Sequence, residues 1–101
     1  MKFECLNLDD IIGFDWDDAN RYKNEKKHGL KWTLIEEVFF NKPLIVIEDF
    51  KHSNEECRCV ALGQSDFGKL ITVVFTIRKQ KIRVISARSM SKKERGVYAK
   101  A

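Results

Sequence analysis

Four apolar stretches follow one another in the second half of the chain, each separated from the next by a short polar turn. They are residues 44–50 (LIVIEDF), 56–63 (ECRCVALG), 69–77 (KLITVVFTI) and 81–88 (KIRVISAR). Consecutive strands that are joined by short loops pair antiparallel. The sequence therefore predicts a four-stranded antiparallel meander, and this feature limits the possible folds more than any other.

Two helices are predicted before the meander. Residues 17–28 start with acids, end with basic side chains and are followed by Gly29. Acids favour the N-terminus of a helix, and bases followed by glycine favour its C-terminus, so this pattern predicts a helix with defined ends. A second helix is expected over about residues 33–40, because Thr33 and Glu36 have the spacing of a capping box and apolar residues follow at helical spacing. Apolar and polar residues alternate over residues 12–16 (IGFDW), which predicts a short strand ahead of both helices.

A third helix is predicted at the C-terminal end. Ser91 and Glu94 form a second capping-box pattern, and Val97 and Tyr98 are the residues that this helix could bury. The expected order of elements is β, α, α, β, β, β, β, α. This order predicts an α+β fold.

Length and composition favour one compact domain over residues 1–101, with residues 1–10 as a loosely ordered lead-in. No stretch approaches the roughly 18 to 20 apolar residues of a membrane span, and no basic start with an apolar run opens the chain. We therefore expect a cytoplasmic protein that does not bind a membrane. The odd cysteine count, from Cys5, Cys57 and Cys59, indicates reduced structural cysteines and neither a disulfide nor a metal site.

Charge is distributed unevenly along the chain. Residues 1–77 hold 10 basic and 14 acidic side chains, whereas residues 78–101 hold 9 basic and one acidic side chain. A basic segment on an otherwise acidic domain points to a polyanionic or acidic partner. Nucleic acid is the first candidate and an acidic protein segment is the second.

Three arginines are expected on one face of the meander. In the third stretch Ile71, Val73, Phe75 and Ile77 share the core face, so the other face is mixed and holds Arg78. Strand alternation puts Arg58 on the same face as Val60 and Leu62, and Arg88 on the same face as Val84 and Ser86. A meander register that joins these faces would bring the three guanidinium groups together.

A guanidinium group is permanently charged, and it can bind two oxygens of one phosphate with two parallel hydrogen bonds. RNA cleavage through the 2′-hydroxyl needs a base, an acid and cations for the charge on the phosphorane, and it needs no metal. His28 and His52 are the two side chains that titrate near neutral pH, and a strongly perturbed Tyr98 could also exchange a proton. Each of these three residues could instead have only a structural or surface role.

Other chemistries lack their sequence patterns. The chain has no phosphate-binding GxxxxGKS/T loop, no GxGxxG dinucleotide loop, no HExxH zinc pattern and no GxSxG nucleophile elbow. Glu48 and Asp49 are adjacent in a strand and therefore face opposite sides, which argues against a carboxylate pair.

An ordered set of short segments resembles the BrnT toxin family over residues 12–98. The segments are FDWD at 14–17, NEKKHGL at 24–30, EEVFFNKP at 36–43, TIR at 76–78, and RVISAR at 83–88 followed by SKKE at 91–94. The chain departs from the family's pattern at Asn20 and Glu25, which weakens the expectation that the first helix contributes to RNA binding. The proposed arginine face is unaffected by these departures.

The resemblance implies a RelE-like ribonuclease toxin of a type II toxin–antitoxin module, with two N-terminal helices on a curved antiparallel sheet and a short C-terminal helix. It implies inhibition of translation and growth, no cofactor and a small BrnA-like ribbon-helix-helix antitoxin through which the complex represses its own operon. The family's recurrent polar positions fall on His52, Arg58, Arg78 and Arg88, with Lys27 and His28 in the KHG segment.

The combined expectation is metal-independent RNA cleavage. Arg58 and Arg88 would hold the scissile phosphate, Arg78 would support them and His52 would act as acid or base. The residues expected to attract the RNA backbone or an acidic antitoxin are Lys27, His28, Lys79, Lys81, Arg83, Lys92, Lys93 and Arg95. The alternative is a non-catalytic or inactivated basic module that binds an antitoxin-like protein or nucleic acid.

Overall fold

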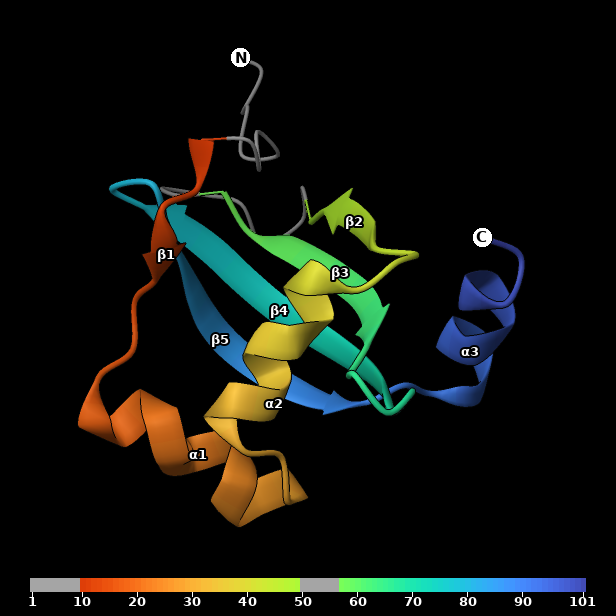
Figure 1. Ribbon diagram of the computed structural model, residues 1–101, viewed down its shortest axis with the longest axis horizontal. Coiled ribbons are helices and arrows are strands. Elements are labelled where there is room, and N and C mark those ends of the chain that lie inside the picture. Colours follow the sequence, from red (N-terminus) through yellow and green to blue (C-terminus); the bar gives the residue numbers. More distant parts are fainter. Residues whose placement is uncertain (1–9, 50–56) are drawn as a thin grey trace.

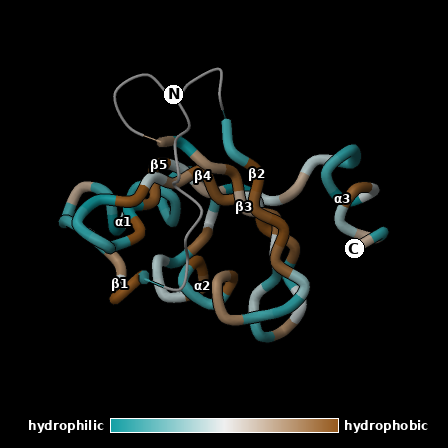
Figure 2. Tube along the Cα trace, turned by 90° about the horizontal axis from the view of Figure 1, so that it is seen from above, coloured by the Kyte–Doolittle hydropathy of each residue, from teal (hydrophilic) through white to brown (hydrophobic). Residues whose placement is uncertain are grey.

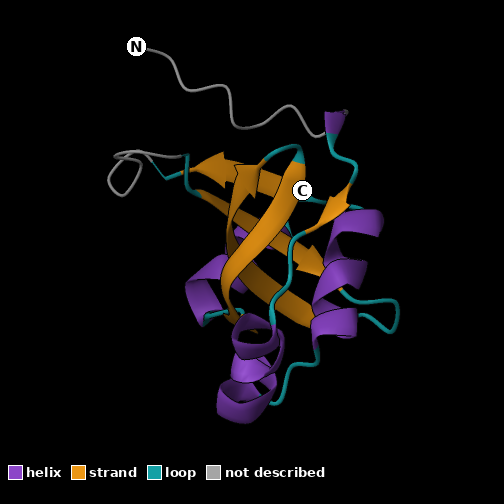
Figure 3. Cartoon of the chain, turned by 90° about the vertical axis from the view of Figure 1, so that its left-hand side faces the viewer, coloured by secondary structure: helices purple, strands orange, loops and turns teal. Residues whose placement is uncertain are grey.

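The computed structural model describes residues 10–49 and 57–101, which form an α+β fold around a five-stranded sheet with the strand order β1-β5-β4-β3-β2 (Figure 1). Four consecutive strands pair antiparallel, each with the next. They are β2 (Ile45–Glu48), β3 (Cys59–Gln64), β4 (Leu70–Arg78) and β5 (Lys81–Ser89). The predicted meander is therefore confirmed, and the sheet is visibly twisted (Figure 3).

The first strand, β1 (Gly13–Phe14), is shorter than expected and pairs parallel with β5. Hydrogen bonds from Ile12 N to Gln80 O and from Asp15 N to Ile82 O, each of 2.8 Å, hold the chain along this edge. The parallel direction is possible because two helices and the rest of the sheet intervene between the two strands.

Two helices follow β1. The first, α1 (Asp18–His28), has the predicted ends, because the Asp17 carboxylate accepts from Asn20 N at 2.7 Å and Gly29 has φ of 70°. The second, α2 (Trp32–Glu37), continues as the 3-10 helix η2 (Val38–Phe40). The predicted cap at Thr33 is wrong, since α2 begins one residue earlier, after Lys31. Glu36 instead accepts a hydrogen bond from Trp16 Nε1 at 2.8 Å.

The main core lies between these helices and one face of the sheet. Leu30, Ile35 and Val38 pack against buried residues of β3, β4 and β5, and Phe75 is at the centre with no exposed surface. The predicted core face of β4 is confirmed for Ile71, Val73 and Phe75, which are fully buried. Hydrophobic residues accordingly run along β3 and β4, whereas α1 and α3 are largely hydrophilic (Figure 2).

A β-bulge in β5 changes which residues share a face. Val74 pairs with Ser86, but the next residue, Phe75, pairs with Val84, so Ile85 is an extra residue. Val84 is therefore in the core and 1% exposed, and the expectation that it shares a face with Arg88 is wrong. Simple alternation fails here because one inserted residue moves the side chains before it in β5 to the opposite face of the sheet.

The last helix, α3 (Lys92–Tyr98), starts with the predicted capping box between Ser91 and Glu94. Tyr98 is buried as expected, but Val97 is 46% exposed, so the expectation that it is buried is wrong. Consecutive side chains of a helix point in directions about 100° apart, so Val97 faces solvent when Tyr98 faces the sheet. No helix within the two described ranges has both the length and the apolar character needed to cross a membrane.

Candidate functional site

The sheet has a second face, opposite α1 and α2, which we call the outer sheet face. Paired residues project to the same side of a sheet, so the register defines this face. It comprises Val60, Leu62, Thr72, Val74, Thr76, Arg83, Ser86 and Arg88. Tyr98 of α3 packs with Leu62 and Met90 and so covers one end of it, while Val60, Val74 and Ser86 are half-buried farther along.

The register assigns all three predicted arginines to this face but at different levels. Arg88 pairs with Thr72, whereas Arg58 directly precedes Cys59, the partner of Phe75, and is therefore level with Thr76. At about 3.3 Å per residue, Arg88 is about 13 Å along the strands from the level of Arg58. Arg78 is two residues farther away, at the end of β4. The cations thus follow the length of the face and do not gather at one point.

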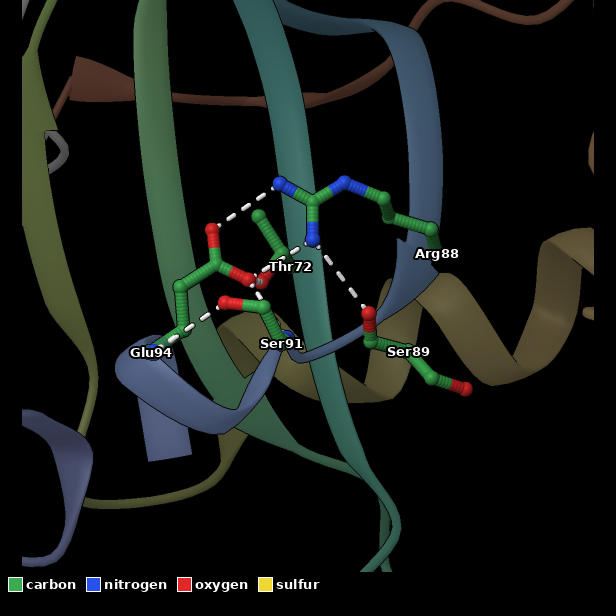
Figure 4. Close-up of polar contacts among 5 residues, drawn as sticks. All are labelled: Thr72, Arg88, Ser89, Ser91 and Glu94. Atoms are coloured by element: carbon green, nitrogen blue, oxygen red, sulfur yellow. Dashed lines mark hydrogen bonds and ion pairs between the residues drawn. The ribbon is translucent and has the colours of Figure 1, made fainter. Parts of the chain in front are cut away.

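Arg88 forms a two-pronged ion pair with Glu94 at the start of α3 (Figure 4). Its Nη1 donates to Glu94 Oε1 at 2.7 Å and its Nη2 donates to Oε2 at 2.9 Å. The Arg88 side chain extends from β5 across β4, and Nη1 also lies 3.3 Å from Ser89 O. This parallel geometry is the strongest form of an arginine–carboxylate contact.

Glu94 is held by two further donors besides Arg88. The Thr72 hydroxyl donates to its Oε1 at 2.9 Å, and Ser91 N donates to the same atom at 2.8 Å. The Arg88 guanidinium is the main reason that the pKa of Glu94 is lowered from 4.5 to about 2. Burial opposes this shift, and the hydrogen bonds from Ser91 and Thr72 add smaller lowering contributions. The same contact raises the pKa of Arg88. Both groups are therefore charged at neutral pH.

Arg83 is engaged elsewhere, although it also belongs to β5. Its Nη2 donates to Asp17 Oδ2 at 2.8 Å and its Nη1 lies 3.6 Å from Asp15 Oδ2. This hydrogen bond is the first cause of the lowered pKa of Asp17. Two acids thus offset the charge of Arg83, although Arg83 is one of the cations expected from the sequence to attract RNA.

The other predicted cations fall into three groups. Lys27 and His28 lie in the last turn of α1, which packs on the core side of the sheet with Asn24 accepting from Ala87 N. Lys79 and Lys81 are exposed beside Arg78 at the turn between β4 and β5. The cations beside Arg88 are the exposed α3 residues Lys92, Lys93 and Arg95.

The structure describes only some of the histidines and cysteines that the sequence singles out. His52 and Cys5 lie outside the described residues. Cys57 and Cys59 are both thiols, and Cys59 is buried in the core. Within residues 10–49 and 57–101, no three His, Cys, Asp or Glu side chains are grouped so that they could hold a metal ion.

Tyr98 acts as a packing residue with an engaged hydroxyl. The hydroxyl donates to Pro43 O at 2.6 Å, and burial raises the pKa of the phenol above its ordinary value of 10.0. Tyr98 therefore remains protonated at neutral pH and links α3 to the segment before β2.

Sequence reasoning missed the part that Glu94 and Thr72 have in this site. Glu94 was assigned only to helix capping, and Thr72 only to the mixed face of β4. One signal was present, because Glu94 is the only acid among residues 78–101. A single acid in a basic segment is a natural partner for one of its arginines.

Comparison with known proteins agrees with this fold. The family model described as the ribonuclease toxin BrnT of type II toxin–antitoxin systems matches residues 16–94. The crystal structure of the Brucella abortus ribonuclease toxin BrnT, at 1.1 Å resolution, is similar, with a TM-score of 0.60 and 27% sequence identity over 80% of this chain and 99% of that chain. No curated protein matches the chain. Because the family match covers most of the sequence, this chain belongs to the BrnT family of ribonuclease toxins of type II toxin–antitoxin systems.

Proposed function

We propose that this protein binds RNA along the outer sheet face and cleaves it beside Arg88. The observation that carries the proposal is the fixed guanidinium of Arg88, which is 45% exposed at the side chain and lies next to the exposed cations of α3. Arg58 and Arg88 contact the RNA backbone on either side of the half-buried residues Val60 and Val74, and Arg78 supports them. Lys79, Lys81, Lys92, Lys93 and Arg95 extend the cationic path at its two ends.

The proposed reaction is metal-independent attack of the RNA 2′-hydroxyl on the adjacent phosphorus, which breaks the bond from phosphorus to the 5′-oxygen of the next nucleotide. The base takes the proton of the 2′-hydroxyl, the acid protonates the departing 5′-oxygen, and a 2′,3′-cyclic phosphate is left. The reaction proceeds through a phosphorane whose extra negative charge guanidinium groups stabilise. His52 is proposed as the acid or base, because a histidine can both accept and donate a proton near neutral pH. Lys27 and His28 contact RNA from the core side of the sheet, opposite the outer sheet face that holds Arg88.

Membership of a type II family implies an antitoxin partner and an RNA target. The proposal extends this to a BrnA-like ribbon-helix-helix antitoxin, whose complex with the toxin represses its own operon. The whole chain, residues 1–101, acts as one toxin domain in the cytoplasm, where cleavage of RNA inhibits translation and growth. The net charge of +8 on residues 78–101 suits both RNA and an acidic antitoxin segment.

The first test is expression of the chain alone in bacteria, beside an Arg58→Ala, Arg88→Ala double variant and a Lys31→Ala control on the helix side. We expect the unchanged protein and the control to stop growth and degrade RNA, and the double variant to do neither. With the purified protein, cleavage should persist when a chelator removes divalent metal ions. Thermal melting shows whether the double variant is folded.

The outcomes separate the alternatives. Normal growth and intact RNA with the unchanged protein would overturn the proposed activity, and salt-sensitive RNA binding without cleavage would indicate a non-catalytic module. Toxicity that survives in the double variant would overturn only the proposed site.

His52 has its own test. The variant His52→Gln should cleave RNA on the order of 100-fold more slowly at unchanged melting temperature, because an acid or base of this kind contributes about that much to the rate. Cleavage at the normal rate would show that His52 has no part in the reaction.

A further inference from the structure

The Arg88 guanidinium has two edges that can each bind an oxyanion with parallel hydrogen bonds, and only one of them is occupied. Glu94 takes the end edge formed by Nη1 and Nη2. Among the described residues, none accepts a hydrogen bond from Nε, so the side edge formed by Nε and Nη2 is open. Figure 4 shows Nε on the side of the guanidinium away from Ser89 and Ser91.

The open edge is fixed in direction because its support is rigid. Glu94 receives bonds from Thr72, which is 1% exposed, and from the backbone N of Ser91. Glu94 N in turn donates to Ser91 Oγ at 3.2 Å, which closes the capping box. The carboxylate is thus tied to both the central strand β4 and the helix α3. A guanidinium held by this carboxylate loses less side-chain freedom when it binds a phosphate.

We propose that Glu94 is a positioning residue for RNA cleavage, which holds Arg88 through its end edge so that the Nε edge binds the scissile phosphodiester. This inference rests on the proposed role of Arg88 in RNA cleavage. Glu94 itself is a poor base, since Arg88, Thr72 and Ser91 all donate to its Oε1 and Arg88 also donates to its Oε2. The carboxylate removes charge from the pair, and the exposed lysines Lys92 and Lys93 in the same first turn of α3 compensate for it.

An opposite role for the same contact makes the opposite prediction. If Glu94 competed with RNA for Arg88, its removal would free the guanidinium and speed cleavage. If Glu94 positions Arg88, its removal leaves a mobile side chain and slows cleavage. The direction of the change therefore distinguishes the two roles.

The test uses Glu94→Gln and a matched Ser91→Ala control. Glutamine is accepted at this position of a capping box, so Glu94→Gln weakens the Arg88 contact while it retains the helix start. Ser91→Ala removes the side-chain cap from the same helix and leaves the Arg88 contact intact. The rates are measured on a labelled RNA that the unchanged protein cleaves, and melting temperatures are measured on all variants.

We expect Glu94→Gln to lower kcat about tenfold with little change in KM, because positioning affects the transition state more than ground-state binding. Ser91→Ala should keep kcat within about twofold even if it lowers the melting temperature more. In an Arg88→Ala background, Glu94→Gln should have no further effect, since the residue acts only through Arg88.

Four results bear on the inference in different ways. Unchanged or faster cleavage by Glu94→Gln would overturn it, as would an equal loss of kcat in Ser91→Ala. A further loss in the Arg88→Ala background would also overturn it, by assigning Glu94 an independent role. Full activity of Arg88→Ala alone would instead overturn the proposed RNA site, and the positioning role with it.

Discussion

Two arginines of β5 show how neighbouring acids decide what a cation can do. Arg83 lies between Asp15 and Asp17, and its side chain is 24% exposed. Arg88 contacts one carboxylate through one edge and is 45% exposed. In the sequence both are basic residues of one segment. In the structure Arg83 links β5 to the start of α1, whereas Arg88 retains N–H donors that can bind a ligand. At this scale the function depends on hydrogen bonds more than on charge.

The Arg88–Glu94 pair should make stability depend on pH in the acid range. The pKa of Glu94 is about 2 in the folded protein and ordinarily 4.5, so the pair stabilises the fold fully above pH 4.5. As the pH falls from 4.5 toward 2, the unfolded chain takes up the proton first and this stability is lost. Because Arg88 is half exposed, the loss is on the order of 1–2 kcal/mol.

Denaturant unfolding between pH 6 and pH 2 measures this effect. Glu94→Gln should reduce the pH dependence below pH 4.5, whereas Ser91→Ala should retain it because the Arg88 contact remains. A Glu94→Gln curve parallel to that of the unchanged protein would mean that other carboxylates account for the acid sensitivity.

At the scale of elements, the meander depends on tight connections between its strands. The turn from β4 to β5 has only Lys79 and Gln80 between the paired residues Arg78 and Lys81. Both turn residues have positive φ, 50° and 65°, which is the type I′ geometry that matches the twist of a hairpin. Such a turn favours glycine in its second position, so Gln80 holds this conformation at a cost in free energy.

Gln80→Gly should therefore raise the free energy of unfolding by about 1 kcal/mol, because glycine adopts positive φ without the clash of a Cβ. Gly29→Ala is the reciprocal variant. Gly29 has φ of 70° with open space around it, so an added methyl strains only the backbone and should lower the free energy of unfolding by about 1 kcal/mol. Chemical denaturation measures both values. A destabilised Gln80→Gly variant would show that the Gln80 side chain makes contacts worth more than the strain.

At the scale of the whole molecule, the sheet separates two surfaces. The helix side holds the main core, and the outer sheet face leads to α3 and its cations. The segment with a charge of +8 thus becomes a surface that runs from the Lys79 turn along β5 to α3. A surface of this kind attracts a polyanion over a distance set by the salt concentration.

RNA affinity should accordingly fall as salt increases, and Lys92→Ala with Lys93→Ala should make that dependence weaker. Each lysine that contacts a phosphate contributes about 0.7 to the slope of log K against log salt for a single strand. The control is Lys31→Ala, which removes an exposed cation at the start of α2 and should leave the slope unchanged. Affinities are measured on 2′-O-methyl RNA, which cannot be cleaved through the 2′-hydroxyl. An unchanged slope in the double variant would place the RNA away from α3.

By itself the sequence determined the strands of the meander, the ends of α1 and the capping box of α3, because each depends on residues close together in the chain. It also determined the resemblance to the family, because that depends only on the order of short segments along the chain. Only the tertiary structure decided the parallel pairing of β1, the bulge at Ile85 and the partners of the charged groups. Arg83 meets Asp17 and Thr72 meets Glu94 only once the chain is folded. Local spacing cannot report such contacts, since they depend on which elements pack together and in which register.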